Sequence, residues 1–284
     1  MIRLLSIEFQ KLWLNRASRV LIISYFVILS FIALIASIEV DILGIHFKLA
    51  DQGIFNFPYI WHFNTYVAVW LKGFLAIIIV SMMANEYTYG TLKQNLIDGF
   101  SKEEFIKSKI LTTVVFALGS TVFIFIMTLL LGYSFSAFDE FSIVFSDMSF
   151  LAGYFLNLFG LFSFCLFAGI LIKRSAFALG FLFIWFIAEQ ITKGIVWNTL
   201  YRGTPESDGI DTFMGFFPLE SFSNLLVEPI TRFQAIKSLG TQIDPNNPMF
   251  QKDYHMHWYH VTISIFWIGF FMYMSYRILK KRDL

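Results

Sequence analysis

The chain has 284 residues, of which 57% are hydrophobic and 14% are charged, and it contains 36 phenylalanines. A soluble domain of this length cannot bury so much apolar surface, so the composition indicates an integral membrane protein. The single cysteine, Cys165, excludes an intrachain disulfide, and the net charge of +1 points to no particular partner, such as a nucleic acid.

The N-terminal segment, residues 1–19, places apolar side chains at helical spacing and basic side chains between them. Ile2, Leu5, Phe9 and Leu12 form the apolar series, and Trp13 can act as an anchor. This pattern predicts an amphipathic helix lying in the inner membrane interface. A helix that simply continues into the first span is the alternative.

Six segments are apolar and long enough to cross a hydrocarbon core about 30 Å thick as helices. They are Val20–Ile38, Tyr66–Met83, Ile110–Leu131, Phe150–Ile172, Ala176–Trp197 and Trp258–Tyr276. The first is longer than a signal-peptide core and lacks a small-residue cleavage site, so we expect it to stay in the mature protein. The predicted fold class is an all-α integral membrane protein with one transmembrane domain over residues 1–284.

Lysine and arginine predict the orientation of these spans. Most of the basic residues lie before the first span, in residues 85–109, at Lys173 and Arg174, or after the last span. By the positive-inside rule, both termini are expected in the cytoplasm.

The external loops predicted by this topology are rich in aromatic residues and turn residues. In the first, Glu39–Thr65, aromatic residues alternate, which suits a strand; beside a membrane we expect them in the outer aromatic belt instead. They are Phe55, Phe57, Tyr59, Trp61 and Phe63. The largest external region, residues 198–257, has turn-rich stretches at Arg202–Gly209 and Asp244–Pro248. Between them, helical spacing interrupted by Pro229 predicts two short helices over the outer mouth.

The segment between the second and third spans, Asn85–Lys109, is charged and strongly patterned. Gly90 can bend a helix sharply, and Ser101 with Glu104 forms an S-x-x-E capping box that begins a new helix. The segment therefore predicts a short helix, a turn and a restart. Glu86 and Lys93 offer charges for pairing, and Leu92, Leu96 and Ile97 offer an apolar ridge. An ordinary solvated loop is the alternative.

The pattern of Glu86, Gly90-Thr91-Leu92-Lys93, Ser101 and Lys109 resembles the first cytoplasmic loop of type 2 ABC export permeases. The six-span layout with an N-terminal interface helix is similar to that family as well. Gly99-Phe100 stands where the family commonly has a proline before the serine. The resemblance implies that residues 85–109 form a coupling loop, with a cytoplasmic coupling helix that touches an ATPase subunit. The coupling residues that it implies are Glu86, Gly90, Thr91, Leu92, Lys93, Leu96, Ser101 and Glu104.

The resemblance also implies export of hydrophobic or amphipathic cargo across the cytoplasmic membrane. The chain would work with a second permease copy or a paralogue, among membrane lipids, and with separately encoded ATPases. Those ATPases would bind ATP and Mg, and this chain itself would hold no cofactor and would not be an enzyme. In agreement with this, the sequence contains no P-loop pattern G-x-x-x-x-G-K-[S/T].

Three ionisable residues inside the predicted spans are candidates for an outer gate or a substrate path. Glu189 and Lys193 stand at i and i+4 in the fifth span, and Lys72 lies in the second. Charged groups within a membrane generally face protein or a water-filled cavity. A self-neutralising pair of Glu189 with Lys193, in which the lysine reaches outward, is the alternative for those two. For Lys72 the alternative is that it also reaches the interface.

His255, His257 and His260 lie at the predicted outer surface before the sixth span. Imidazoles can bind zinc or copper, but positions i and i+2 do not share a helix face, so interfacial anchoring is favoured and no metal site is predicted. Two other functions stay open. One is an intramembrane enzyme that uses Glu189, Lys193 and these histidines, and the other is a scaffold or regulator that uses the 85–109 segment only for binding.

Overall fold

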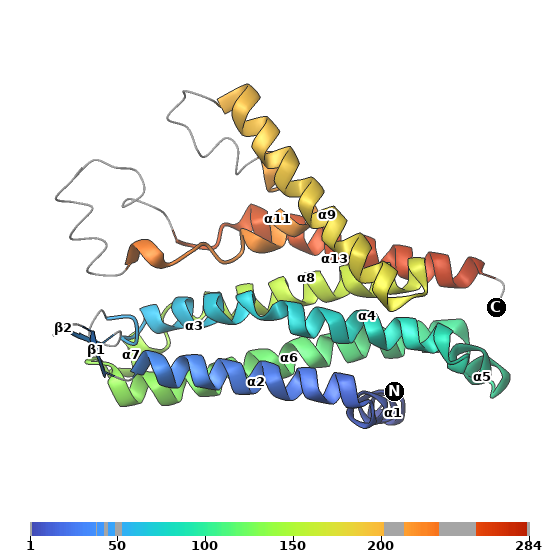
Figure 1. The fold of residues 1–284 in the computed structure, drawn as a ribbon, viewed down its shortest axis with the longest axis horizontal. Coiled ribbons are helices and arrows are strands. Elements are labelled where there is room, and N and C mark those ends of the chain that lie inside the picture. The colour runs from blue at the N-terminus through green and yellow to red at the C-terminus, as the bar shows by residue number, and fades with distance from the viewer. Residues whose placement is uncertain are drawn as a thin grey trace.

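The computed structural model describes residues 2–37, 39–42, 45–48, 53–201, 213–232 and 254–282. Within these residues four helical stretches are each long and apolar enough to cross a membrane. Two further helix pairs, bent by 89° and 49°, raise the number to six if each pair forms one span. Most of the long helices lie roughly side by side (Figure 1). Their bounds are as follows: α1 Ile2–Leu14, α2 Arg16–Ser37, α3 Tyr59–Trp70, α4 Lys72–Thr88, α5 Thr91–Ile97, α6 Lys102–Phe135, α7 Phe141–Val144, α8 Ser149–Ile172, α9 Ser175–Val196, α11 Pro218–Ser223 and α13 Trp258–Lys281.

The N-terminal segment is a separate helix and not the start of the first span. α1 and α2 meet at 89°, and the break lies at Asn15. Asn15 Oδ1 accepts a hydrogen bond from the backbone N of Ser18 at 3.2 Å, as expected of an N-cap residue that starts a new helix. The amphipathic helix predicted for this segment is therefore distinct from α2, and it packs against α2 and α6.

A two-stranded antiparallel hairpin follows α2. Strand β1 covers Glu39–Ile42 and strand β2 covers Ile45–Lys48, with Glu39 opposite Lys48. Within the described residues the chain is otherwise helical, as predicted, and the hairpin lies in the segment predicted as a loop, Glu39–Thr65.

The second span differs from its prediction in two ways. Helix begins at Tyr59, inside the predicted loop, and α3 and α4 are bent by 49° at Leu71. Two polar residues of α3 have hydrogen-bond partners inside the bundle. Asn64 Nδ2 donates to Thr128 Oγ1 of α6 at 3.0 Å, and His62 Nε2 lies 2.5 Å from the backbone O of Val227. Lys72 is the first residue after the bend.

The aromatic residues of the first loop are mostly core residues, so the prediction of an outer aromatic belt is wrong for them. Phe55, Phe57 and Trp61 are buried, whereas Tyr59 is half exposed. The Trp61 ring stacks on Phe125 of α6 with centroids 5.6 Å apart, and its Nε1 donates to the backbone O of Val144 at 2.7 Å. These side chains pack α3 onto α6 and α7 instead of facing lipid headgroups.

Helix α8 lies at the centre of the bundle, in contact with α3, α4, α6, α9 and α13. α9 leans away from the other long helices beyond its N-terminal half (Figure 1), and it continues as a π-helical turn, η2, Trp197–Tyr201. α11 and a 3₁₀ turn, η3, Ile230–Arg232, are the short helices described between α9 and α13. The turn-rich stretches predicted at 202–209 and 244–248 lie outside the described residues.

Candidate coupling site

Both ends of α5 depend on glycines with left-handed backbone. Gly90 precedes the helix with φ +69°, a conformation that strains any other residue, and it forms the predicted bend. Gly99 follows the helix with φ +96°. Its N donates to Leu96 O at 3.2 Å, and Phe100 N donates to Asn95 O at 3.0 Å. These two bonds make a Schellman motif, so glycine makes the turn before Ser101.

The capping box predicted at the start of α6 is present. Ser101 Oγ accepts from the backbone N of Glu104 at 3.1 Å, and Ser101 N donates to Glu104 Oε2 at 2.9 Å. α5 is thus a short helix with a defined stop, followed by a defined restart. The restart leads into a 34-residue helix, which at 1.5 Å per residue is about 51 Å long and exceeds the thickness of the hydrocarbon core.

Four charged side chains from three helices form one network beside α5. Lys109 Nζ of α6 lies 2.6 Å from Glu86 Oε1 of α4 and 2.5 Å from Glu8 Oε2 of α1. Lys11 Nζ of α1 lies 2.9 Å from the same Glu86 oxygen and 3.4 Å from Glu8 Oε1. We call Glu8, Lys11, Glu86 and Lys109 the charge network.

Three members of the charge network are buried and Lys11 is partly exposed, and the network also holds the first residue of α5. Lys109 is 0% exposed and Glu86 is 3% exposed. The second oxygen of Glu86, Oε2, accepts from Thr91 Oγ1 at 2.5 Å. Removing one member of a buried ion pair leaves an uncompensated charge at low dielectric, which is strongly destabilising. The charge network therefore holds α1, α4, α5 and α6 together, because separating its buried members would cost much free energy.

The structure corrects two expectations about the surface that α5 offers. Glu86 does not present its carboxylate to a partner, because the charge network encloses it. Leu92 does not belong to an exposed ridge, because it is 1% exposed and lies in the core. Ile97 is 77% exposed, Leu96 is half-buried, and Lys93 is exposed. We call Tyr89, Lys93 and Ile97 together the α5 outer face.

The C-terminal end of the chain contacts the same region. Lys102 Nζ, in the first turn of α6, donates to the backbone O of Arg282 at 2.6 Å and of Lys280 at 3.3 Å. Arg282 in turn donates to the last carbonyls of α8, to Ile170 O at 2.5 Å and Leu171 O at 3.0 Å. Cations at helix C-termini satisfy free carbonyls there, so these contacts tie α6, α8 and α13 together.

The three predicted gate residues do not form one cluster of charges. Each of them makes a hydrogen bond or an ion pair with another residue of the chain. Glu189 accepts from Trp185 Nε1 at 2.7 Å and from the backbone N of Glu220 at 3.1 Å. Within the described residues Lys193 pairs with Glu220 rather than with Glu189, so the self-neutralising pair is not what the structure shows. Lys72 Nζ donates to Asn157 Oδ1 of α8 at 3.0 Å.

The histidines predicted to be external lie at the start of α13. His257 precedes the helix and His260 is in its first turn, with ring centroids 6.0 Å apart. Across the described part of the chain, no group of three or more His, Cys, Asp or Glu side chains is placed to hold a metal ion.

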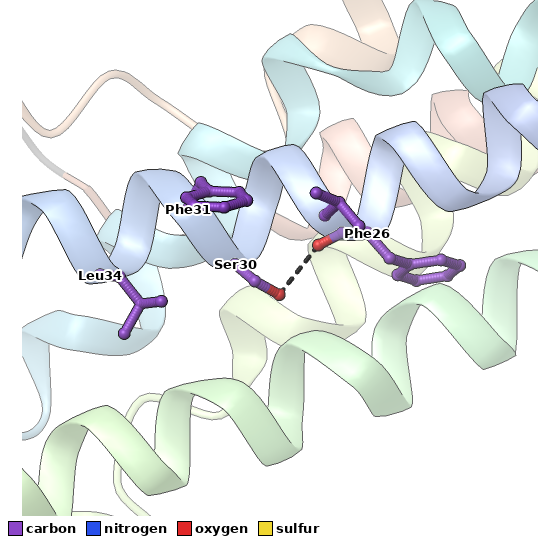
Figure 2. Close-up of a pocket in the computed structure, with 5 residues that line it drawn as sticks. Phe26, Ser30, Phe31 and Leu34 are labelled. Carbon is purple, nitrogen blue, oxygen red and sulfur yellow. Dashed lines mark hydrogen bonds between the residues drawn. The ribbon is translucent and has the colours of Figure 1, made fainter.

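A shallow groove of about 230 Å³ lies on α2. Figure 2 shows Phe26, Ser30, Phe31 and Leu34, and Val27 completes the lining. Ser30 Oγ donates to Phe26 O at 2.9 Å, so its hydroxyl is satisfied within the helix. The groove is thus apolar in character, as suits a surface that meets lipid.

Sequence reasoning missed Glu8, Lys109 as a buried ion, Asn157 and Glu220. Lys109 carried a signal, because it stands at the entry of an apolar run, where a lysine needs a partner. Glu8, 101 residues away, could not be identified as that partner, since only the packing of α1 on α6 brings the two together.

Comparison with known families gives one match. Residues 4–189 match a family described as ABC-2 family transporter protein. The matched region covers more than half of the chain and includes most of α1, all of α5 and the charge network. A search of curated proteins found no match.

Proposed function

Because the chain belongs to the ABC-2 transporter family, we propose that it is the permease subunit of an ATP-driven exporter that works with separate ATPase subunits. In this proposal α2 makes the first span and the bent pair of α3 and α4 makes the second, which with the four long helical stretches gives six spans. The distribution of basic residues supports a cytoplasmic location for both termini and for α5.

The observation that carries the proposal is the construction of α5. It is a short helix between two glycines with left-handed backbone, and the α5 outer face is exposed. Its first residue, Thr91, is hydrogen-bonded to Glu86 of the charge network. A partner that binds Tyr89, Lys93 and Ile97 would therefore contact a rigid helix, which can act as a lever, rather than a flexible loop.

In this proposal the charge network transmits a movement of α5 to the neighbouring helices. When a partner shifts α5, Thr91 and Glu86 shift with it, and Lys109 and Glu8 follow, since separating them would leave buried charges unpaired. The ends of α4 and α6 and the interface helix α1 would therefore move as one body. ATP binding and closure in the ATPases would supply the force.

The cargo is proposed to be hydrophobic or amphipathic, as family membership suggests, and the working unit a dimer of this chain or of this chain with a paralogue. The apolar faces of the spans, including the groove on α2, suit cargo that enters from the lipid phase.

The test is co-purification of the permease with its ATPase after changes on the α5 outer face. Lys93→Glu with Ile97→Asp should reduce ATPase recovery at least about tenfold, because loss of a central interface residue costs about 2 kcal/mol or more. The matched control exchanges Glu103 and Lys107, an exposed pair in the first turns of α6, and should leave recovery unchanged. Full recovery and full transport with the α5 variant would refute the docking role.

A further inference from the structure

Lys173 ends α8 in a backbone conformation that favours glycine. Its φ is +66°, and among the described residues it is the one non-glycine residue with a positive φ. Its backbone N donates to Gly169 O at 3.0 Å, which closes the helix with a turn that usually carries glycine at this position. A side chain on left-handed backbone costs free energy, and such residues point to a function for the side chain that is kept. The Lys173 ammonium is therefore a candidate functional group.

Three cations meet around Tyr87, in the last turn of α4. Lys173 Nζ lies 5.7 Å from the centroid of the Tyr87 ring, and Arg282 Cζ lies 5.9 Å from it. Lys102 joins them, since its Nζ donates to the backbone O of Arg282 at 2.6 Å. We call Lys102, Lys173 and Arg282 the basic cluster. Three more basic residues, each exposed, stand next to the cluster in the sequence: Arg174, Lys280 and Lys281.

The partners that hold the basic cluster in place are electrically neutral. Arg282 donates to carbonyls at the end of α8, and Lys102 donates to carbonyls at the end of α13. Within the described residues, no carboxylate forms an ion pair with the cluster. The carboxylates nearest to it in the sequence have other partners, since Glu86 is in the charge network, Glu103 is in an exposed ion pair and Glu104 closes the capping box. The positive charge of the cluster is therefore left for an external anion.

The basic cluster borders exposed apolar surface. Leu171 is 39% exposed just before the turn from α8 to α9, and Phe177 is 65% exposed just after it. Arg282 ties the end of α13 to this turn, at the same end of the bundle as α5 (Figure 1). An anionic phospholipid matches both parts of this surface, because its phosphate faces cations and its acyl chains face apolar side chains. An acidic protein surface would match the cations alone.

We propose that the basic cluster, together with Arg174, is a binding site for the phosphate of an anionic phospholipid. The site goes beyond the proposed transport function, and its place in the cytoplasmic leaflet rests on the proposed topology. The bound phosphate accepts hydrogen bonds from Lys173 and Arg174, and it offsets the repulsion between the two cations that share the Tyr87 ring. Because Tyr87 lies directly before α5, the lipid stabilises the junction of α4 and α5.

The test counts the lipid bound to the purified full-length chain. The protein is stripped of lipid in detergent, and phosphatidylglycerol is added in increasing amounts. Native mass spectrometry records the bound lipid, and the apparent melting temperature records its effect. Phosphatidylglycerol should bind and raise the melting temperature. Phosphatidylcholine, whose choline group neutralises the phosphate, and inorganic phosphate, which has no acyl chains, should not.

Lys173→Gly combined with Arg174→Gln removes two cations without adding strain. Glycine adopts the left-handed conformation freely, so the variant should keep the melting temperature of the parent in the absence of lipid. Its half-saturating concentration of phosphatidylglycerol should rise at least about tenfold, because each basic residue near a headgroup contributes to binding. Lys173→Arg, which keeps the charge, should bind as the parent does. Arg3→Gln combined with Arg16→Gln removes two exposed cations from α1 and α2, and this matched control should leave the affinity unchanged.

The lipid site would be overturned by unchanged affinity in the Lys173 and Arg174 variant, or by an equal loss in the control, which would indicate unspecific attraction. Equal binding of phosphatidylcholine, or full stabilisation by inorganic phosphate, would also exclude it. Reduced ATPase recovery with unchanged lipid binding would make the cluster a protein contact instead. If the parent binds no ATPase and phosphatidylglycerol binding still depends on these two residues, the transport proposal fails and the lipid site stands.

Discussion

Lys109 Nζ lies within 2.6 Å of carboxylate oxygens from both Glu86 and Glu8, and no part of its side chain is exposed. The lysine thereby joins the helix that leads into α5 to the N-terminal helix. Its ammonium lies 5.1 Å from the centroid of the Phe105 ring. A charge so enclosed is tolerated because two anions face it.

The charge network should behave as one unit in stability measurements. Lys109→Met should lower stability by about 3–5 kcal/mol, because it leaves two carboxylates buried with one cation. Glu86→Gln should also be harmful, but the double variant should be much less harmful than the sum of the two. The apparent melting temperature of the purified protein in detergent measures this. Glu103→Gln with Lys107→Met, in an exposed ion pair of the same helix, is the control and should have little effect. Mild and additive effects at 86 and 109 would show that the network contributes little.

Gly90 should resist substitution more than glycines within helices that have open space around them. Gly90→Ala forces a side chain into the left-handed conformation at φ +69°, at a cost of about 1–2 kcal/mol. We expect a shifted α5, reduced ATPase recovery and an intact membrane insertion. Gly119→Ala, in the middle of α6 with no atom within 4 Å of an added Cβ, should be neutral or stabilising. Equal behaviour of the two variants would argue against a geometric role for Gly90.

The proposed topology can be tested with single cysteines at two exposed positions. Glu140→Cys lies between α6 and α7, and Gln94→Cys lies on α5, each in a Cys165→Ser background. An impermeant thiol reagent applied to intact cells should label position 140 and should reach position 94 only after the cells are broken. Labelling of position 94 in intact cells would invert the orientation, and with it the cytoplasmic placement of α5.

Packing of the first-loop aromatics on α6 predicts a size constraint at Gly132. A Cβ at this position would stand 2.2 Å from Cζ of the Phe57 ring. Gly132→Ala should therefore destabilise the protein by about 1–3 kcal/mol, the usual cost of overpacking. Phe57→Leu in the same chain should recover much of the loss, as seen in the melting temperature. If Phe57 instead faced lipid, Gly132→Ala would be harmless.

The parts of the fold that the sequence predicted well depend on neighbouring residues. Apolar runs located α6, α8, α9 and α13, and the bend at Gly90 and the restart at Ser101 follow from backbone preference and side-chain capping within a few residues. The bend at Leu71 was missed, because no proline marks it and the apolar pattern resumes directly after Lys72 and Gly73.

The contacts that define the candidate site depend on long-range packing. Glu189 and Lys193 have the spacing of a helical pair, yet Glu189 finds the amides of a helix 30 residues further on, and Lys193 finds Glu220. Likewise, the sequence alone favours a membrane-interface position for Phe57 and Trp61, and only the packing of α3 on α6 shows that they are buried. Local pattern cannot show which of two satisfactory partners a charged or aromatic side chain will meet.

The charge network also bears on how transport should respond to voltage. Its two glutamates and two lysines sum to zero charge, and they are proposed to move together. Moving one elementary charge through the full membrane potential costs about 2.3 kcal/mol per 100 mV, but a neutral group that moves as a unit carries no such cost. The lever that joins α5 to the spans should therefore work equally well in energised and in depolarised membranes.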